Sequence, residues 1–548
     1  MTFGNWWGRG DETRHYLWNV RPPALWAHQP AEAVSLWQTS LCTQSQRKYT
    51  EEDESKMEVV KHGGVYPQKS LKKNAVLNIT KTFMSLVFPL ITFPYASRVL
   101  GPVYIGKIYF AQSIVSYFSL IAALGISAYA VRETARYRDD MSALSVFAKE
   151  IFFINMTSTL IAYSLFFMAV FAIPQLSEHR KLLCIVSGSI LFTTIGMDWL
   201  YVGLEEFRYI TIRAITFQFI SLVLLFSLVK TQDDYLKYAG ISVVSSAGSN
   251  LLNFIHSRKF IDFHIKTRLA LRRHLKPVLT LFATNAAISI YTVLDTTMLG
   301  FLKDDESVGI YTAATKINRV VVMMITAAIA VLLPRLSYFS RNENRTEFLR
   351  VANRAMQFII LSAVPCAIGL FILSEPIVFL FSGMEYGSSV PVMKIMNAVI
   401  VFISLGTLMG GNILVSVGKE RFTMFAAYIG ATSNFILNII LIPKYGVCGA
   451  AAGSVCAEAF VMTALFVFGR KIVNWNLFLK AVFHSVLSAS VMAVLVFAIR
   501  EYVKNTAMQV FTAVFAGATV YFISLLVMHN ELAWTVLESV RKKHLCRK

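Results

Sequence analysis

Residues 91–113 read ITFPYASRVLGPVYIGKIYFAQS, and residues 294–316 read LDTTMLGFLKDDESVGIYTAATK. Both stretches contain Leu-Gly, a short polar interruption between two apolar runs, and then a glycine, Ile-Tyr and an alanine. A second pair agrees on nearly the same offset, with KYAGISVVSSAGSNLLNF at 237–254 and KYGVCGAAAGSVCAEAF at 444–460. The chain therefore contains an internal repeat with a period of about two hundred residues.

The composition is that of a membrane protein. Of 548 residues, 55% are hydrophobic and only 15% are charged, and the mean hydropathy is +0.56. A soluble chain carries about a quarter charged residues. The apolar runs are roughly 20 residues long, which is the helix length that crosses the hydrocarbon core. They are continuous rather than alternating, unlike barrel strands. These features predict an all-α integral membrane protein.

About fourteen transmembrane helices are predicted from these runs. The repeat joins spans one and two in its first copy and spans seven and eight in its second. We therefore expect two six-helix bundles related by a pseudo-two-fold axis along the membrane normal, followed by two C-terminal helices. The predicted spans are 75–97, 108–130, 147–173, 182–204, 209–229, 235–256, 277–302, 307–333, 356–381, 390–417, 422–443, 448–469, 477–499 and 506–528.

The first part of the chain differs from the rest. Residues 1–73 are polar and rich in tryptophan and contain no signal peptide, so we expect a disordered or extraneous extension, with the true start of translation at or near Met57. The other predicted domains are the first bundle at 74–256, a basic linker at 257–276, the second bundle at 277–470, two additional helices at 471–528 and a basic tail at 529–548.

The distribution of charge predicts the orientation. The net charge is +20, but Lys and Arg lie in alternate loops, which argues against a nucleic-acid partner. By the positive-inside rule both termini are cytoplasmic. The six cysteines show no CxxC or Cys/His spacing, so neither a metal site nor a cofactor is expected. The basic segments are 132–138, 258–276, 335–354 and the final RKKHLCRK.

Several stretches, in this order and spacing, resemble Wzx-type oligosaccharide flippases. These flippases move O-antigen, capsule or exopolysaccharide repeat units and form the polysaccharide transporter family of the multidrug/oligosaccharidyl-lipid/polysaccharide exporter superfamily. The resemblance extends from about Lys72 to the last span, and the N-terminal extension is its one departure. The stretches are FPYASRVLGPVYIGKIYFAQSIVSYF (93–118), LGISAYAVRETARYRDD (124–140), WLYVGLEEFRYITIR (199–213), DTTMLGFLKDDESVGIYTAATKIN (295–318), LLPRLSYF (332–339) and IPKYGVCGAAAG (442–453).

The resemblance implies two bundles in a V around a central cavity that opens alternately to each side of a bacterial inner membrane. It implies an undecaprenyl-pyrophosphate-linked oligosaccharide repeat unit as cargo, moved from the cytoplasmic to the periplasmic leaflet. Membrane lipids, a polysaccharide polymerase and a chain-length regulator are the other implied partners.

Four cations are candidates for binding the anionic cargo. Lys316 and Arg319 lie on one face of span eight, where paired cations suit a pyrophosphate. Alternatively, Lys316 pairs with Asp295 and joins two helices. Arg98 either binds cargo at the outer mouth or is a snorkelling anchor. Lys81 either faces the cavity or lies at the cytoplasmic interface.

Two carboxylates are candidates for ion coupling. Glu458 lies near the middle of span twelve, where a lone carboxylate could bind and release a proton. The alternative is a neutral, hydrogen-bonded helix contact. Asp295 is the second candidate, unless Lys316 keeps it ionised.

Other function classes have less support. The predicted outer loops are short, and no HEXXH, GxSxG or P-loop motif is present, so we do not expect an enzyme. A cation- or proton-coupled drug antiporter of the same superfamily is the alternative function. A scaffolding role seldom requires so many spans.

Overall fold

The computed structural model describes residues 71–264, 269–535 and 537–538, and all regular structure within these ranges is helical. Met57 and the predicted extension up to residue 70 lie outside the described residues, as does the tail from residue 539. Asp and Asn side chains begin several of the helices by accepting hydrogen bonds from free backbone N–H groups. These caps are Asp140, Asp304, Asn344, Asn474 and Asn505.

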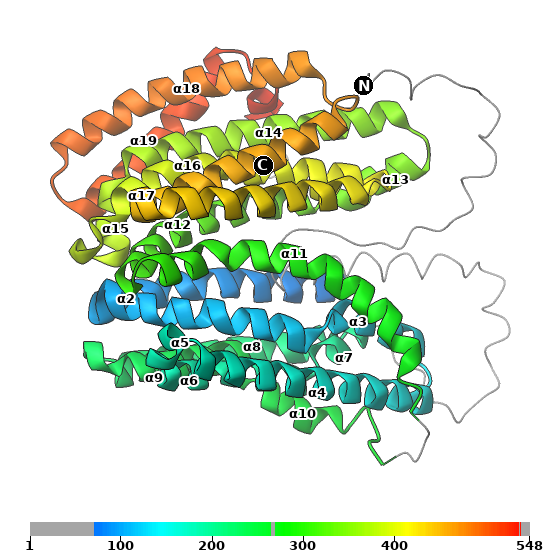
Figure 1. The fold of residues 1–548 in the computed structure, drawn as a ribbon. Coiled ribbons are helices and arrows are strands. Elements are labelled where there is room, and N and C mark those ends of the chain that lie inside the picture. The colour runs from blue at the N-terminus through cyan, green and yellow to red at the C-terminus, as the bar shows by residue number, and fades with distance from the viewer. Residues whose placement is uncertain (1–70, 265–268, 536, 539–548) are drawn as a thin grey trace, which may run out of the picture.

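The first group of helices, called the first bundle here, lies in the lower half of Figure 1. A π-helical turn at Val244–Gly248 separates its last two helices. The members are α2 (Leu71–Ala123), α3 (Ile126–Tyr137), α4 (Met141–Ala172), α5 (Pro174–Glu178), α6 (Arg180–Gly196), α7 (Asp198–Gly203), α8 (Phe207–Leu228), α9 (Tyr235–Val243) and α10 (Asn250–Ser257).

The second bundle follows, and two further helices, α18 and α19, pack beside α14 at the top of Figure 1. The members are α11 (Arg272–Leu302), α12 (Asp305–Ala330), α13 (Leu333–Arg341), α14 (Arg345–Ile372), α15 (Ser374–Ser382), α16 (Ser389–Gly406) and α17 (Glu420–Gly469), then α18 (Trp475–Tyr502) and α19 (Thr506–Val527). A 3-10 turn at Met384–Tyr386 precedes α16, and a π-helical stretch at Thr407–Leu414 extends it.

Ten helical stretches among the described residues are long and apolar enough to cross a membrane. Two of the helices, α2 with 53 residues and α17 with 50, each contain two spans that meet at a kink. The kinks lie at Gly101 (φ 73°) and Gly446 (φ 57°), where a left-handed backbone favours glycine. The predicted fold class, an all-α membrane protein of about fourteen helices, is confirmed. The domain boundaries stay a prediction.

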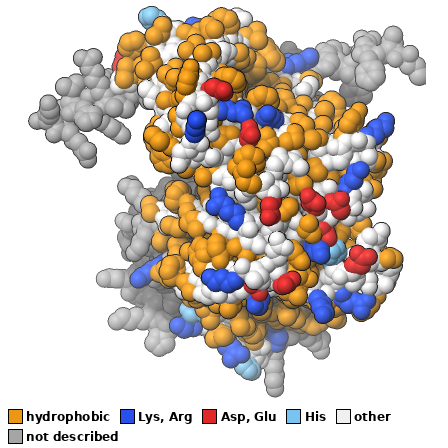
Figure 2. Space-filling model, turned by 90° about the vertical axis from the view of Figure 1, so that its left-hand side faces the viewer, with side chains coloured by type: hydrophobic (Ala, Val, Ile, Leu, Met, Phe, Trp, Pro, Cys, Tyr) orange, Lys and Arg blue, Asp and Glu red, His pale blue; other side chains and the backbone are white. Residues whose placement is uncertain are grey.

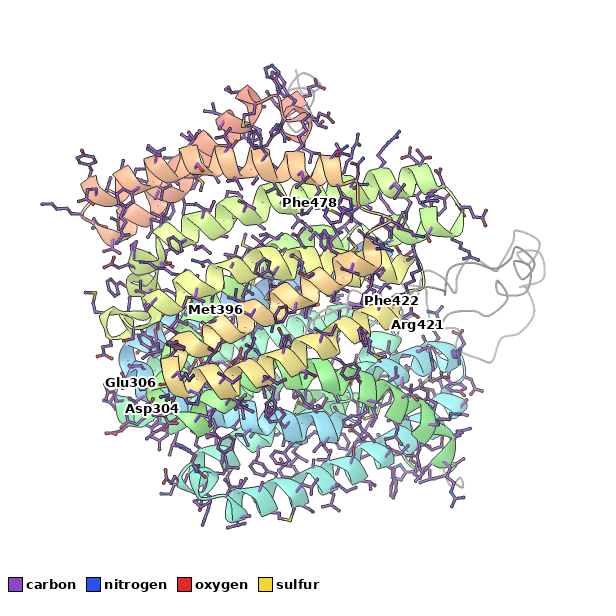
Figure 3. The ribbon with its side chains drawn as sticks, turned by 45° about the horizontal axis from the view of Figure 1, so that its top comes forward. Asp304, Glu306, Met396, Arg421, Phe422 and Phe478 are labelled. Carbon is purple, nitrogen blue, oxygen red and sulfur yellow. The ribbon has the colours of Figure 1, made fainter. Side chains whose placement is uncertain are left out.

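The molecule has two distinct ends. We call the end that carries α3, α7 and α13 the basic end, because Arg136, Arg341 and Arg421 lie there. Asp304 and Glu306 mark the opposite end, as Figure 3 shows. Figure 2 looks onto this opposite end, where charged side chains of both signs lie among hydrophobic ones.

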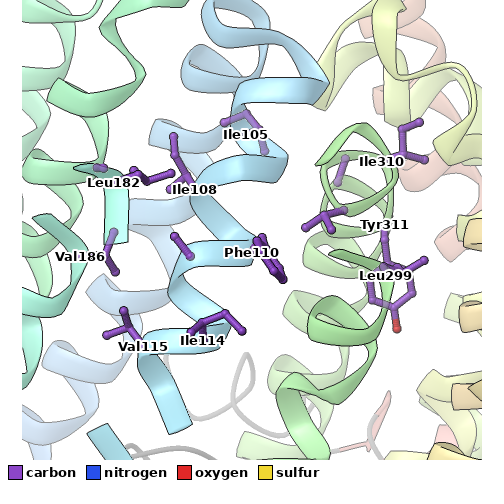
Figure 4. Packing of buried hydrophobic residues seen from close by; sticks show 14 of the residues in the cluster. Ile105, Ile108, Phe110, Ile114, Val115, Leu182, Val186, Leu299, Ile310 and Tyr311 are labelled. Atoms are coloured by element: carbon purple, nitrogen blue, oxygen red, sulfur yellow. The ribbon is translucent and has the colours of Figure 1, made fainter. Parts of the chain in front are cut away.

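The largest hydrophobic core lies around the second half of α2 and includes residues of both bundles. Figure 4 shows that this half-helix has α6 on one side and α11 and α12 on the other. The labelled side chains are Ile105, Ile108, Phe110, Ile114 and Val115 of α2, Leu182 and Val186 of α6, Leu299 of α11, and Ile310 and Tyr311 of α12. The core thus places α2 at the interface between the bundles.

Candidate functional site

The two bundles are in backbone contact where α2 meets α12, at the end opposite the basic end. A Cβ atom on Gly106 would lie 1.6 Å from the carbonyl oxygen of Asp305. One on Gly309 would lie 2.0 Å from the carbonyl oxygen of Pro102. Both glycines belong to the repeated stretches, so the two copies of the repeat close this end of the molecule together.

Lys316 and Arg319 lie on α12, about 17 and 21 Å along its axis from its first residue. Three residues apart, they share a face of the helix. Lys316 is half-buried and Arg319 is exposed. The Lys316 ammonium lies over two aromatic rings, 4.6 Å from the centroid of Tyr109 and 4.9 Å from that of Phe93. Within the described part of the chain no ion pair joins Lys316 to Asp295. The alternative that this pair holds two helices together is therefore not seen in the structure.

The other two candidate cations lie on α2. Arg98 is exposed and donates from Nη2 to the carbonyl oxygen of Leu380, 2.5 Å away on α15. Lys81 is half-buried and precedes Arg98 by about 25 Å of helix. The structure therefore brings Lys316 and Arg319 together and leaves Lys81 and Arg98 at opposite ends of one helix segment.

Asp295, on α11, accepts hydrogen bonds from four neutral side chains. Its Oδ1 accepts from the amides of Asn434 at 3.0 Å and Asn438 at 2.7 Å. Its Oδ2 accepts from the hydroxyl of Tyr311 at 2.6 Å and from that of Ser454. The donors come from α12 and from both halves of the kinked α17, so this carboxylate joins three helices of the second bundle.

Asp295, its four donors, Glu458 and Tyr291 form a group that we call the carboxylate strip, which Glu458 extends by one helical turn. Glu458 follows Ser454 on α17 and accepts a hydrogen bond from the Tyr291 hydroxyl at 2.6 Å. Tyr291 in turn lies one helical turn before Asp295 on α11. The two candidate carboxylates are therefore brought together between α11 and α17. In the same strip, the Oδ1 atom of Asn438 is buried and has no hydrogen-bond partner among the residues that the structure describes.

The sequence indicates both carboxylates but none of the side chains that donate hydrogen bonds to them in the structure. The available signal was the spacing of two asparagines, Asn434 and Asn438, one turn apart in an apolar span. Polar side chains in such a span normally face other helices or a cavity.

The sequence also gives no indication of a second buried hydrogen-bond network, which lies at the basic end. Glu150 on α4 is fully buried and accepts hydrogen bonds from Arg273 at 2.5 Å, His274 at 2.8 Å and the backbone N–H of Ala270 at 2.7 Å. The Tyr129 hydroxyl lies 2.7 Å from the other ring nitrogen of His274. This network attaches the beginning of α11 to the first bundle.

The site therefore separates two kinds of chemistry. Lys316 faces α2 of the other bundle, and Arg319 lies one turn further along the same face of α12. Neither has a carboxylate partner among the described residues, so they can hold an anion. The carboxylates of α11 and α17 lie inside the second bundle among neutral donors, where a proton or a small cation can be exchanged.

Two family models match the chain. The model described as "Polysaccharide biosynthesis protein" matches residues 71–340, and the model described as "MatE" matches residues 281–440. A "Putative O-antigen transporter" from Escherichia coli strain K12 is 22% identical over 405 residues, which cover 73% of this chain and 97% of that protein. A "Probable flippase AglR" from Haloferax volcanii is 28% identical over 42% of this chain and 49% of its own length.

Solved structures show the same fold. The structure titled "Lipid II flippase MurJ, inward closed conformation" has a TM-score of 0.67 at 18% identity and covers 84% of this chain and 99% of its own. An inward-facing multidrug resistance MATE family transporter has a TM-score of 0.54 at 14% identity, over 73% of this chain and 98% of its own. At these identities the likeness concerns the fold alone.

Proposed function

Because the chain belongs to the polysaccharide transporter family of the multidrug/oligosaccharidyl-lipid/polysaccharide exporter superfamily, we propose that it is a flippase for lipid-linked glycans. We propose more specifically that its cargo is an undecaprenyl-pyrophosphate-linked oligosaccharide repeat unit of the O-antigen type. The protein would carry it from the cytoplasmic to the periplasmic leaflet by alternating access.

One observation supports this cargo most directly. Lys316 and Arg319 are two cations on one helix face, near the middle of a span, with no carboxylate paired to them among the described residues. A charged side chain within a membrane span is costly unless it has a partner. A pyrophosphate diester supplies permanent negative charge and several acceptor oxygens, and hydrogen bonds between ionised groups are strong. Arg98 and Lys81 are proposed as weaker contacts for the cargo along its path.

Coupling to an ion is proposed at the carboxylate strip of the second bundle. Glu458 lies one helical turn after Ser454 on α17, and Ser454 donates a hydrogen bond to Asp295 on α11. The partners of both carboxylates are neutral donors rather than cations. Loading a proton or a small cation there would change the hydrogen bonds among three helices. Such a change can bias the two arrangements of a transporter differently.

The test is transport in proteoliposomes loaded with an undecaprenyl-pyrophosphate-linked oligosaccharide, with accessibility of the glycan to an added lectin as the readout. Lys316→Ala/Arg319→Ala is compared with the charge-preserving Lys316→Arg/Arg319→Lys. We expect the first pair to lose transport and the second pair to retain part of it. Lys480→Ala, an exposed lysine on α18, is the matched control and should transport like the wild type.

Ion coupling is tested in the same vesicles with imposed proton or sodium gradients. Glu458→Gln and Asp295→Asn should abolish the response to the gradient. If the Lys316→Ala/Arg319→Ala variant folds and transports normally, the anion site is wrong. If the wild type moves no lipid-linked glycan, the proposed cargo is wrong.

The membrane and its orientation are also proposals. The concentration of Lys and Arg at one end supports a cytoplasmic position for that end and for both termini, in the inner membrane of a bacterium. A polymerase and a chain-length regulator that consume the delivered repeat unit are proposed as protein partners.

A drug antiporter is the second candidate, favoured by the MatE match over residues 281–440. In that case the carboxylate strip would exchange an ion for a cationic solute. Uptake of a cationic dye into the same vesicles, without glycan transport, would support the antiporter over the flippase.

A further inference from the structure

The contact between Lys316 and its two aromatic rings crosses from one bundle to the other. Lys316 lies on α12 of the second bundle, whereas Phe93 and Tyr109 lie on α2 of the first bundle. Phe93 is 1% exposed, and its ring also stacks on that of Phe381 of α15, with ring centroids 5.5 Å apart and an interplanar angle of 23°. An aromatic ring of the first bundle is thus held between two side chains of the second.

The ammonium of Lys316 has no stronger protein partner. Among the described residues it forms neither a hydrogen bond nor an ion pair, and its contacts are with the π faces. A cation–π contact is weaker than a charge-assisted hydrogen bond to a phosphate oxygen. An anion that reaches Lys316 therefore competes effectively with the rings.

We propose that Lys316 is a latch between the bundles that the anionic group of the cargo releases, an inference that rests on the proposed function. With no cargo bound, the ammonium lies on Phe93 and Tyr109 and stabilises the contact of α12 with α2. When a pyrophosphate binds Lys316, this contact is lost and the arrangement with this end open is favoured. The ligand shifts the equilibrium because it binds the arrangement with a free ammonium more tightly.

The latch can be broken by removing a ring or by removing the cation, and the two changes should have opposite effects on binding of the anion. Phe93→Leu or Tyr109→Leu removes a ring but leaves the cation. The open arrangement, in which the ammonium is free to bind an anion, then becomes more populated, so the apparent affinity for the anion rises. Lys316→Met removes the cation, so the end opens without cargo and no longer responds to it. Tyr109→Phe keeps the ring and is the matched control.

The experiment measures the distance between the bundles by double electron–electron resonance on the full chain in lipid nanodiscs. Spin labels are placed at Asp233→Cys and Met384→Cys, both exposed at the end opposite the basic end, after replacement of the six native cysteines by alanine. The probe is undecaprenyl pyrophosphate, and undecaprenol, with the same tail and no phosphate, is its control.

We expect the ratio of open to closed arrangements to rise about two- to thirty-fold in Lys316→Met, Phe93→Leu and Tyr109→Leu, the range between an exposed and a desolvated cation–π contact. Tyr109→Phe should match the wild type. Undecaprenyl pyrophosphate, but not undecaprenol, should open the wild type, and Lys316→Met should not respond.

The possible outcomes test two hypotheses separately, the existence of the latch and its release by the cargo. If Lys316→Met and Tyr109→Leu leave the distances unchanged, the latch is wrong, even where Lys316→Met also lowers glycan transport and the proposed function stands. If these variants open the end but undecaprenyl pyrophosphate does not open the wild type, release by the cargo is wrong. Since Phe93 is buried and its replacement can disturb folding, Tyr109→Leu and Lys316→Met decide the result.

Discussion

At Asp295, on α11, a single carboxylate accepts hydrogen bonds from donors on two other helices, α12 and α17. Without it, Asn434 and Asn438, which are 1% and 0% exposed, each lose the acceptor of one amide hydrogen bond, and the Asn438 amide keeps its bond to the Asn434 oxygen. A buried donor left unsatisfied costs about 1–3 kcal/mol. We expect Asp295→Ala to lower the free energy of unfolding by at least about that amount, measured by denaturant titration of the purified protein in detergent.

The comparison for this prediction is Glu458→Ala, one turn away. Glu458 accepts from one side chain, the Tyr291 hydroxyl, so its removal should cost less, about 1 kcal/mol. Equal costs for the two substitutions would show that the hydrogen bonds to Asp295 do not stabilise the second bundle.

The identity of the candidate residues was predictable from the sequence, but their partners were not. A charge inside an apolar run is conspicuous in any sequence, which is how Asp295 and Lys316 were found. Which side chains face them depends on the rotation of each helix and on the kink at Gly446, which brings Ser454 and Asn438 of one helix to the same carboxylate. Periodicity in a helix that is apolar all round does not fix that rotation.

At the scale of elements, the crossing of α2 and α12 depends on Gly106. We expect Gly106→Ala to separate these helices, because the new Cβ would meet a backbone carbonyl oxygen that cannot turn aside as a side chain can. The measurement is labelling of Ile105→Cys, at a position that is 0% exposed, by a membrane-impermeant maleimide. Labelling should increase several-fold in Gly106→Ala. Gly188→Ala, where the nearest atoms lie 3.8 and 3.9 Å away, is the control and should change nothing.

The attachment of α11 to the first bundle depends on Glu150. This carboxylate is 0% exposed and accepts from Arg273, His274 and a backbone N–H. A hydrogen bond to a charged group contributes about 1.5–3 kcal/mol, so Glu150→Gln should lower the free energy of unfolding by about that amount. The partly exposed pair of Glu375 and Arg500 is the reference, and Glu375→Gln should cost about 0–1 kcal/mol. A smaller effect at Glu150 than at Glu375 would contradict the proposed attachment.

The spans were predicted more accurately than the helices that contain them. Predicted spans 75–97 and 108–130 fall largely within one kinked helix, α2, because the backbone continues through the Gly101–Pro102 turn as helix on both sides. Predicted span 235–256 is instead divided into α9 and α10 by the turn at Val244–Gly248. Apolar length identifies a crossing of the membrane, whereas helix ends and π-turns depend on local packing that hydropathy does not report.

At the scale of the whole molecule, the repeat predicted two bundles but could not predict which end is closed. Both arrangements of a transporter contain the same helices, and a few kcal/mol separate them. The closed end is set by contacts between the copies of the repeat, such as those of Gly106 with α12 and of Ser113 with Thr297. These contacts become visible only when the two copies are placed against each other in space.

Transport by alternating access requires the bundles to separate at this end, which a cross-link can test. The Ser113 and Thr297 oxygens lie 3.0 Å apart across the interface of α2 and α11. We expect Ser113→Cys/Thr297→Cys to stop glycan transport when oxidised and to recover it on reduction. Ser488→Cys/Ser524→Cys, whose oxygens are 3.1 Å apart between α18 and α19, controls for cross-linking without joining the bundles, and should transport in both states. Full transport by a completely oxidised Ser113→Cys/Thr297→Cys protein would mean that α2 and α11 stay together throughout the cycle, so that opening must occur elsewhere.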